Sequence, residues 1–280
     1  MWSYVSHYKQ KKMDVLSFLD TAKELGVDGV EILDYFWDDK DHQLPRVKDK
    51  LETLELPVSA YAIGNNLTNP DAEERERQIQ SIRDGVDMAN LLETNRLRVF
   101  AGNLAEGVEY DAAFQWIVDG LAEASAYAEP QGVTLCLENH GLLAGSGQQV
   151  KQIIEAVGST ALKANPDTGN FMLVNENSVE AVRLLAPLSG SVHFKDFRQA
   201  RPDETEHVYE GLNGARVVGT AIGEGDVDLP AVVQALQDGG YDGFLTIEYE
   251  GVEDPETALP RSVAYAQSVA RGELIGNAPT

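Results

Sequence analysis

The sequence predicts an α/β fold, a single (β/α)8 barrel that occupies residues 1–280 as one domain. Short apolar segments of strand length alternate with longer segments of helical period, and no Ser/Gly/Pro-rich linker interrupts them. Strands that are apolar at nearly every position are typical of a parallel sheet covered on both faces. Seven or eight such strand–helix units favour a closed barrel, a fold that usually needs about 250 residues.

Seven apolar runs are predicted as strands because each is short and bounded by turn residues. They are residues 29–33, 58–63, 97–102, 133–138, 161–167, 191–194 and 244–248. The remaining strand of the barrel is expected at residues 2–5, Trp-Ser-Tyr-Val. That first strand is unusually short and looks truncated.

Helical periodicity fills the intervals between the strands. The predicted helices are residues 13–25, 43–55, 71–93, 111–129, 148–157, 179–185, 229–238 and 255–270. Gly26 is a stop signal after the first helix, and Asp71 is an N-cap for the third. Asp226 and Asp228 can cap the helix that begins near Leu229.

A long connection, residues 198–227, follows the run that ends at residue 194. Its central part, residues 201–216, is charged and irregular, and it forms either a lid or a surface excursion. Glycines at 219, 223 and 225 do not follow a strand, as the glycines of a dinucleotide or phosphate loop would.

The charge of the chain excludes one class of partner. Its formal net charge is −24, from 22 Lys+Arg against 46 Asp+Glu, so a phosphate backbone would repel it and no nucleic-acid binding is expected. The acidic residues are spread along the whole chain. They form either an ordinary solvated surface or one adapted to a salt-rich cytoplasm.

The sequence predicts a cytoplasmic protein without a membrane segment. No apolar run approaches the roughly 18 residues of a membrane span, and the N-terminal residues lack the apolar centre of a signal peptide. Cys136 is the single cysteine, so no intrachain disulfide can form. The short first strand and nearby aromatic residues leave room for a homo-oligomer.

Four potential metal ligands lie at or just beyond the C-terminal ends of consecutive strands: Glu138, Asp167, His193 and Glu248. In a parallel barrel these ends converge on one mouth, so residues far apart in sequence meet there. Taken alone, each of these residues is more simply interpreted as a surface carboxylate or a packed histidine. Together they predict one divalent metal ion and chemistry on a small oxygenated substrate.

Three carboxylates and one imidazole suit Mn²⁺ first, with Mg²⁺, Co²⁺ or Zn²⁺ as alternatives. Two coordination positions would remain for substrate oxygens or water. Strand residues two apart face the same way, so His140 accompanies Glu138, Lys195 accompanies His193 and Glu250 accompanies Glu248.

Further candidates for substrate binding come from the ends of the strands. Asn170 is a candidate hydroxyl binder, and Glu31 either faces the pocket or forms a salt bridge inside the barrel mouth. Trp2 and His7, near the short first strand, either form a wall of the pocket or cover the end of the barrel.

Six stretches carry a family resemblance: residues 26–32, 137–140, 165–170, 192–196, 223–228 and 239–248. Through them the chain resembles the xylose-isomerase-like TIM-barrel superfamily, specifically its sugar phosphate isomerase/epimerase group. The resemblance covers nearly the whole chain and implies that Glu138, Asp167, His193 and Glu248 ligate the metal.

In similar ketose epimerases, the glutamates that correspond to Glu138 and Glu248 also exchange the substrate proton. Similar 3-dehydroshikimate dehydratases carry a histidine at the position of His140. The chain departs from the epimerase pattern at Asn170, where many epimerases have histidine. It also has Arg198 one position earlier than their substrate-binding arginine.

The resemblance implies a metal-dependent isomerase or epimerase of a sugar or sugar phosphate. Its expected reaction is proton transfer next to a carbonyl through a metal-stabilised enediolate, with Glu138, Glu248, His140 and Lys195 as catalytic residues. One alternative is a lyase of the same superfamily, of the inosose dehydratase, 3-dehydroshikimate dehydratase or C-glycoside deglycosidase type. The second alternative is a non-catalytic carbohydrate-binding protein.

Overall fold

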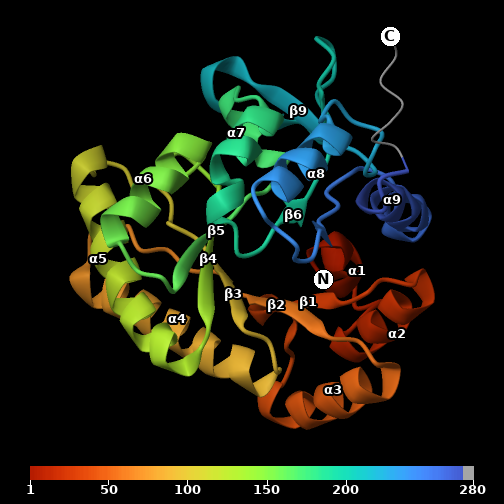
Figure 1. Cartoon of the computed structure of the whole chain (residues 1–280), viewed down its shortest axis with the longest axis horizontal. Helices are drawn as coiled ribbons and strands as arrows, with labels where there is room; N and C mark the ends of the chain where they lie inside the picture. The colour runs from red at the N-terminus through yellow and green to blue at the C-terminus, as the bar shows by residue number, and fades with distance from the viewer. Residues whose placement is uncertain (274–280) are drawn as a thin grey trace. The chain divides into compact units, whose positions relative to one another are not determined.

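The computed structural model describes residues 1–273, and the chain divides into two compact units. Unit 1 comprises Met1–Leu137 and Ala156–Lys163, and unit 2 comprises Glu138–Glu155 and the chain from Ala164 onward. The ribbon in Figure 1 is coloured from red at the N-terminus to blue at the C-terminus. The predicted single domain over residues 1–280 stays a prediction, and its last seven residues lie outside the described ones.

Five strands form one sheet in chain order. They are β1 (Val30–Leu33), β2 (Val58–Ala62), β3 (Arg96–Val99), β4 (Thr134–Glu138) and β5 (Leu162–Asn165). The pairs β1–β2, β2–β3 and β3–β4 are parallel. Every residue of β1 and β2 is buried. The continuous apolar runs in the sequence predict this burial, because they are typical of strands covered on both faces.

The helices of unit 1 follow local signals in the sequence. They are α1 (Val5–Lys9), α2 (Val15–Leu25), α3 (Lys40–Leu54), α4 (Ala72–Leu91) and α5 (Tyr110–Ala128), with short 3-10 turns at Trp2–Tyr4, Asp34–Phe36 and Glu129–Gln131. Gly26 ends α2 at φ 70°, and the Asp71 carboxylate accepts the Glu73 amide at the start of α4. Figure 1 shows α2 and α3 side by side.

The predicted first strand, residues 2–5, is wrong. Trp2–Tyr4 is a 3-10 turn that runs directly into α1. The Tyr4 amide donates to the Met1 carbonyl over 2.9 Å, so local hydrogen bonding within the turn replaces pairing with a neighbouring strand. Aromatic and β-branched residues made this segment look like a strand, although its backbone bonds are satisfied locally.

Unit 2 continues the parallel pairing with β6 (His193–Phe194) and β10 (Thr246–Ile247). Isolated parallel bridges Ala164↔Ser189 and Asp167↔His193 join the end of β5 to the start of β6. The helices are α6 (Gly147–Val157), α7 (Ser178–Leu185), α8 (Leu229–Asp238) and α9 (Pro255–Ala270), with 3-10 turns at Asn170–Val174, Ala186–Leu188 and Leu212–Gly214. All seven apolar runs predicted as strands therefore contain one.

The long connection after β6 contains a short antiparallel sheet, while most of residues 201–216 is irregular, as predicted. Strands β7 (Phe197–Gln199), β8 (Tyr209–Glu210) and β9 (Arg216–Gly219) form it in the order β7–β9–β8. Asp226 accepts the Gln199 amide over 2.6 Å, so it ties this sheet down, while Asp228 is the N-cap of α8.

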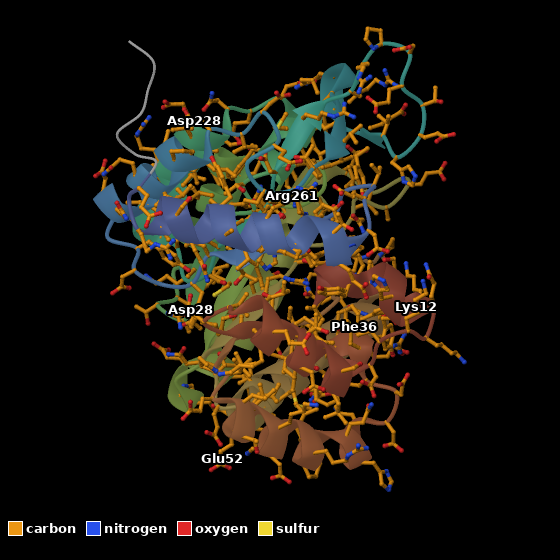
Figure 2. The ribbon with its side chains drawn as sticks, turned by 90° about the vertical axis from the view of Figure 1, so that its right-hand side faces the viewer. Lys12, Asp28, Phe36, Glu52, Asp228 and Arg261 are labelled. Carbon is orange, nitrogen blue, oxygen red and sulfur yellow. The ribbon has the colours of Figure 1, made fainter. Side chains whose placement is uncertain are left out.

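Helix α9 is fastened at the surface by one arginine. Arg261, labelled on α9 in Figure 2, pairs with Glu224 and Glu253. No helix among residues 1–273 is long and apolar enough to cross a bilayer.

Candidate metal centre

The four predicted ligands are brought together by strand pairing within unit 2. Glu138 ends β4, Asp167 follows β5, His193 begins β6 and Glu248 follows β10. The Asp167↔His193 bridge aligns β5 with β6. The Glu248 amide donates to the Phe194 carbonyl over 3.2 Å, which aligns β10 with β6.

One ligand atom from each of Glu138, Asp167, His193 and Glu248 lies within 4.8 Å of the other three. The imidazole Nδ1 of His193 is 3.2 Å from Oε2 of Glu138 and 3.2 Å from Oε2 of Glu248. All four residues are buried. Three carboxylates concentrated in so small a volume repel one another, so the cluster favours a bound cation.

Asp167 is held by its neighbours on both sides. Its Oδ1 accepts the amides of Gly169 and Asn170 over 3.0 and 3.1 Å, which leaves Oδ2 directed at the cluster. The side chain of Asn139 donates to the Asp167 carbonyl over 3.1 Å and accepts the Asp167 amide over 2.6 Å. This pair of bonds fixes the backbone that carries the ligand.

Lys195 places a buried ammonium beside the ligands. Its Nζ lies 2.8 Å from Oδ2 of Asp167, 2.9 Å from Oε2 of Glu248 and 3.5 Å from Oε2 of Glu250. The Thr168 hydroxyl accepts the Lys195 amide and donates to its carbonyl, over 2.9 and 2.6 Å. The lysine backbone is therefore as firmly fixed as that of Asp167.

The charges of the cluster shift its pKa values in opposite directions. Burial raises the pKa of Asp167 to about 8 against the opposing pull of Lys195. Burial also acts to raise the pKa of Glu248, but the charges of Lys195 and His193 outweigh it and hold that pKa well below its usual range. Burial would lower the pKa of Lys195, yet the carboxylates of Asp167, Glu248 and Glu250 raise it well above normal.

The donor set fits a divalent metal ion. Carboxylate oxygens with one imidazole nitrogen are typical ligands of Mn²⁺ and Mg²⁺, and they converge on one point in this structure. A metal at this point would also neutralise the carboxylates that repel one another. Glu138, Asp167, His193 and Glu248 would hold it, and their hydrogen-bonded neighbours would orient them.

Three other predicted site residues lie in unit 2, at different distances from this cluster. Asn170 is buried; it donates to Oε1 of Glu138 over 3.3 Å and accepts from Lys195 Nζ over 3.4 Å. His140, two residues after the end of β4, is exposed. Arg198 forms a bidentate ion pair with Glu204, over 2.8 and 2.7 Å, so its guanidinium is engaged inside the β7–β9–β8 sheet segment.

The remaining three predicted residues belong to unit 1. Glu31 is buried in β1, and its carbonyl accepts the N-terminal ammonium over 3.2 Å. His7 is buried on α1 with its ring 5.7 Å from that of Tyr4. The Trp2 ring lies 6.3 Å from the Tyr35 ring.

Sequence reasoning missed Asn139 and Thr168, which position Asp167 and Lys195 respectively. Asn139 follows the last residue of β4, and its side chain bonds the Asp167 backbone, so no argument from strand alternation selects it. Thr168 lies inside one of the resembling stretches, but a hydroxyl that bonds a backbone leaves no pattern in the sequence. Glu250, by contrast, was selected from the sequence because it lies two residues after Glu248.

Comparison with known proteins identifies the family. The sequence model of the xylose isomerase-like TIM barrel family matches residues 19–269. An inosose dehydratase of Clostridium perfringens is 22% identical over 231 residues, which cover 78% of this chain and 77% of that protein.

Two solved structures share the fold. The 3-keto-D-glucoside 4-epimerase of E. coli superposes with a TM-score of 0.74 at 18% identity, over 91% of this chain and 95% of the other. A xylose isomerase-like TIM barrel protein of Mycobacterium smegmatis, in complex with magnesium, gives 0.72 at 18% identity over 92% and 89%. At such low identity these likenesses establish the fold alone. Because the family match spans most of the sequence, the chain belongs to the xylose isomerase-like TIM barrel family.

Proposed function

We propose that this protein is a divalent-metal-dependent enzyme that transfers a proton next to a carbonyl of a small sugar or polyol. One observation carries the proposal: the ligand atoms of Glu138, Asp167, His193 and Glu248 converge within 4.8 Å in a buried cluster. The relatives support the substrate class, because their names describe inosose and keto-glucoside chemistry.

The metal proposed here is Mn²⁺, with Mg²⁺, Co²⁺ or Zn²⁺ as alternatives. When bound, the ion would act as a Lewis acid towards the carbonyl and a neighbouring hydroxyl of the substrate. The first support for Mn²⁺ or Mg²⁺ is the ligand set itself, in which hard oxygen donors outnumber nitrogen by three to one.

The proton transfers are assigned to Glu138 and Glu248. One oxygen of each carboxylate lies 3.2 Å from Nδ1 of His193, so both carboxylates face one site. The charges of Lys195 and His193 outweigh burial and lower the pKa of Glu248, which favours the ionised form that a base needs. If the other carboxylate returns the proton to a different face or carbon, the product is an epimer or an isomer.

A lyase is the second candidate, and the sequence relatives favour it because the compared curated relative is an inosose dehydratase. Loss of a hydroxyl from the neighbouring carbon needs an acid. Lys195 supplies a buried ammonium 2.9 Å from Oε2 of Glu248 and can protonate the departing oxygen. The exposed His140, two residues after the end of β4, is the other proposed acid.

Substrate binding is proposed for Asn170, Arg198, Glu31, Trp2 and His7. Asn170 has the strongest support, because its amide already joins Glu138 to Lys195. Arg198 would first have to leave Glu204 before it could bind an anionic group.

The deciding experiment is proton NMR in D₂O with the Mg²⁺-loaded protein and a panel of ketoses, inososes and 3-dehydroshikimate. Deuterium incorporated next to a carbonyl together with an isomeric sugar establishes an isomerase or epimerase. An olefinic or deoxygenated product establishes a lyase. Saturable binding without exchange for every compound would leave a non-catalytic carbohydrate-binding protein and would overturn the proposal.

We predict that Glu248→Gln loses turnover by about 10²–10⁴-fold, the usual contribution of a placed base. Glu250→Gln is the matched control, because it removes a carboxylate two residues along the same segment that contacts Lys195 from 3.5 Å but is not a ligand. Bound metal is measured in both variants. Near-normal turnover of Glu248→Gln with metal still bound would contradict the assignment.

A further inference from the structure

Three side chains in successive contact, Tyr209, Phe197 and Lys195, connect the β7–β9–β8 sheet with the metal centre. Phe197, at the start of β7, is fully buried, and its ring centroid lies 5.7 Å from Nζ of Lys195. The Tyr209 ring, on β8, packs on Phe197 with centroids 5.6 Å apart and planes tilted by 32°. Lys195 in turn contacts two of the four ligands.

A second contact fixes the same sheet beside Glu248. Gly219, at the end of β9, forms a bridge with Gly251. A Cβ on Gly219 would lie only 2.2 Å from the carbonyl oxygen of Glu250, so the two backbones touch and only glycine fits. The sheet is therefore pressed against the segment that follows the last ligand.

The electrostatic surroundings of Tyr209 agree with this placement. Burial is the first cause that raises the pKa of Tyr209 to about 12, and the charges of Glu250 and Glu248 raise it further while Lys195 opposes them. Tyr209 is nevertheless 41% exposed. Its ring packs on Phe197, and the residue is partly open to solvent.

We infer that Tyr209 is a substrate-binding residue of this centre, packing on the C–H face of a polyhydroxylated ring while its hydroxyl bonds a substrate oxygen. Sugar and polyol rings offer apolar C–H faces between their hydroxyls. Tyrosine matches them with a rigid ring and one polar group that both donates and accepts. The β7–β9–β8 sheet is then a wall of the site that sets specificity.

The choice of ligand rests on the proposed function, but the placement of Tyr209 does not. A first test therefore uses placement alone. The protein is prepared with 3-fluorotyrosine at its ten tyrosines, and Tyr209→Phe identifies the ¹⁹F resonance of Tyr209. Paramagnetic Mn²⁺ should broaden this resonance beyond detection, while diamagnetic Mg²⁺ leaves it sharp. A resonance that stays sharp at saturating Mn²⁺ overturns the inference.

A second test measures binding. In the Mg²⁺ form, the Tyr209 resonance should shift saturably with a ketose or inosose that the protein binds. Where that compound is turned over, Tyr209→Ala should raise KM about tenfold and Tyr209→Phe about threefold, the loss of one hydrogen bond, while kcat changes little. Leu212→Ala is the matched control, since Leu212 is 37% exposed in the same segment.

The outcomes separate the two proposals. Broadening by Mn²⁺ and a sugar-induced shift, without any exchange or turnover, would support Tyr209 and reject the enzyme assignment. Turnover with an unchanged KM for Tyr209→Ala, or an equal rise for Leu212→Ala, would reject the binding role of Tyr209 and leave the proposed reaction standing.

Discussion

At the residue scale, the side-chain amide of Asn139 holds the metal ligand Asp167 in place without being a ligand itself. Its fully buried side chain forms two hydrogen bonds with the backbone of Asp167, one to the carbonyl and one from the amide. We predict that Asn139→Ala lowers the free energy of unfolding by about 1–3 kcal/mol, because a buried N–H and C=O lose their partners. The variant should also bind Mn²⁺ more weakly, since Asp167 is no longer fixed.

Denaturant unfolding and Mn²⁺ titration measure both effects. Asn90→Ala is the control, since the exposed Asn90 side chain donates to the Gln131 side chain over 3.0 Å, away from the metal ligands. We expect it to change stability by no more than about 0.5 kcal/mol. An Asn139→Ala protein with unchanged Mn²⁺ affinity would show that Asp167 keeps its geometry without these two hydrogen bonds.

Strand ends allowed Glu138, Asp167, His193 and Glu248 to be selected from sequence. The signal is strong because a parallel sheet sends every C-terminal end to one edge, whatever the intervening loops do. Asn139 carries no such signal, because its function depends on a carbonyl and an amide from another strand. The ion pair between Arg198 and Glu204 could not be predicted from the sequence either, because it depends on how the connecting segment bends.

At the element scale, helices α2 to α9 were predictable, whereas α1 and the strands of the β7–β9–β8 sheet were not. Asp71, Asp228 and Gly26 mark helix ends by bonds within one turn, so a local sequence determines them. Residues 2–5 have strand-forming side chains but form a turn, because their hydrogen bonds close locally. The strands of the β7–β9–β8 sheet have two to four residues, too few for alternation to appear against charged neighbours.

The approach of β9 to the segment after β10 gives a prediction at this scale. We expect Gly219→Ala to destabilise the protein by about 1–3 kcal/mol or more, because its Cβ would collide with a backbone carbonyl that cannot rotate away. Gly64→Ala is the control: its Cβ would meet only Oδ2 of Asp34, at 4.0 Å. Thermal unfolding of both variants provides the comparison, and equal melting temperatures would refute the close approach.

At the scale of the whole molecule, every residue of the candidate centre belongs to unit 2. The contacts that define it, from Asn139 to Glu250, therefore lie within one compact part of the chain. The substrate-binding residues proposed in unit 1, Trp2, His7 and Glu31, lie outside that part of the chain.

The net charge of −24 gives the last prediction. With 46 acidic against 22 basic residues, ion pairs such as Arg261 with Glu224 can satisfy only part of the carboxylates. The unpaired excess repels itself in the folded state, and salt shortens the range of that repulsion from about 10 Å at 0.1 M to about 3 Å at 1 M. Exposed ion pairs also weaken in salt, but each contributes only about 0–1 kcal/mol.

We therefore expect the melting temperature to rise by a few degrees between 0.1 and 1 M KCl, since about 1 kcal/mol shifts it by roughly 2–4 °C in a domain of this size. Sucrose at equal osmolality is the control, because it is excluded from the surface without screening charge. A larger rise in KCl than in sucrose attributes the gain to screening and favours a surface suited to a salt-rich cytoplasm. A melting temperature that stays flat or falls with KCl would mean that the carboxylates are too far apart to repel one another appreciably. The chain would then have an ordinary solvated acidic surface.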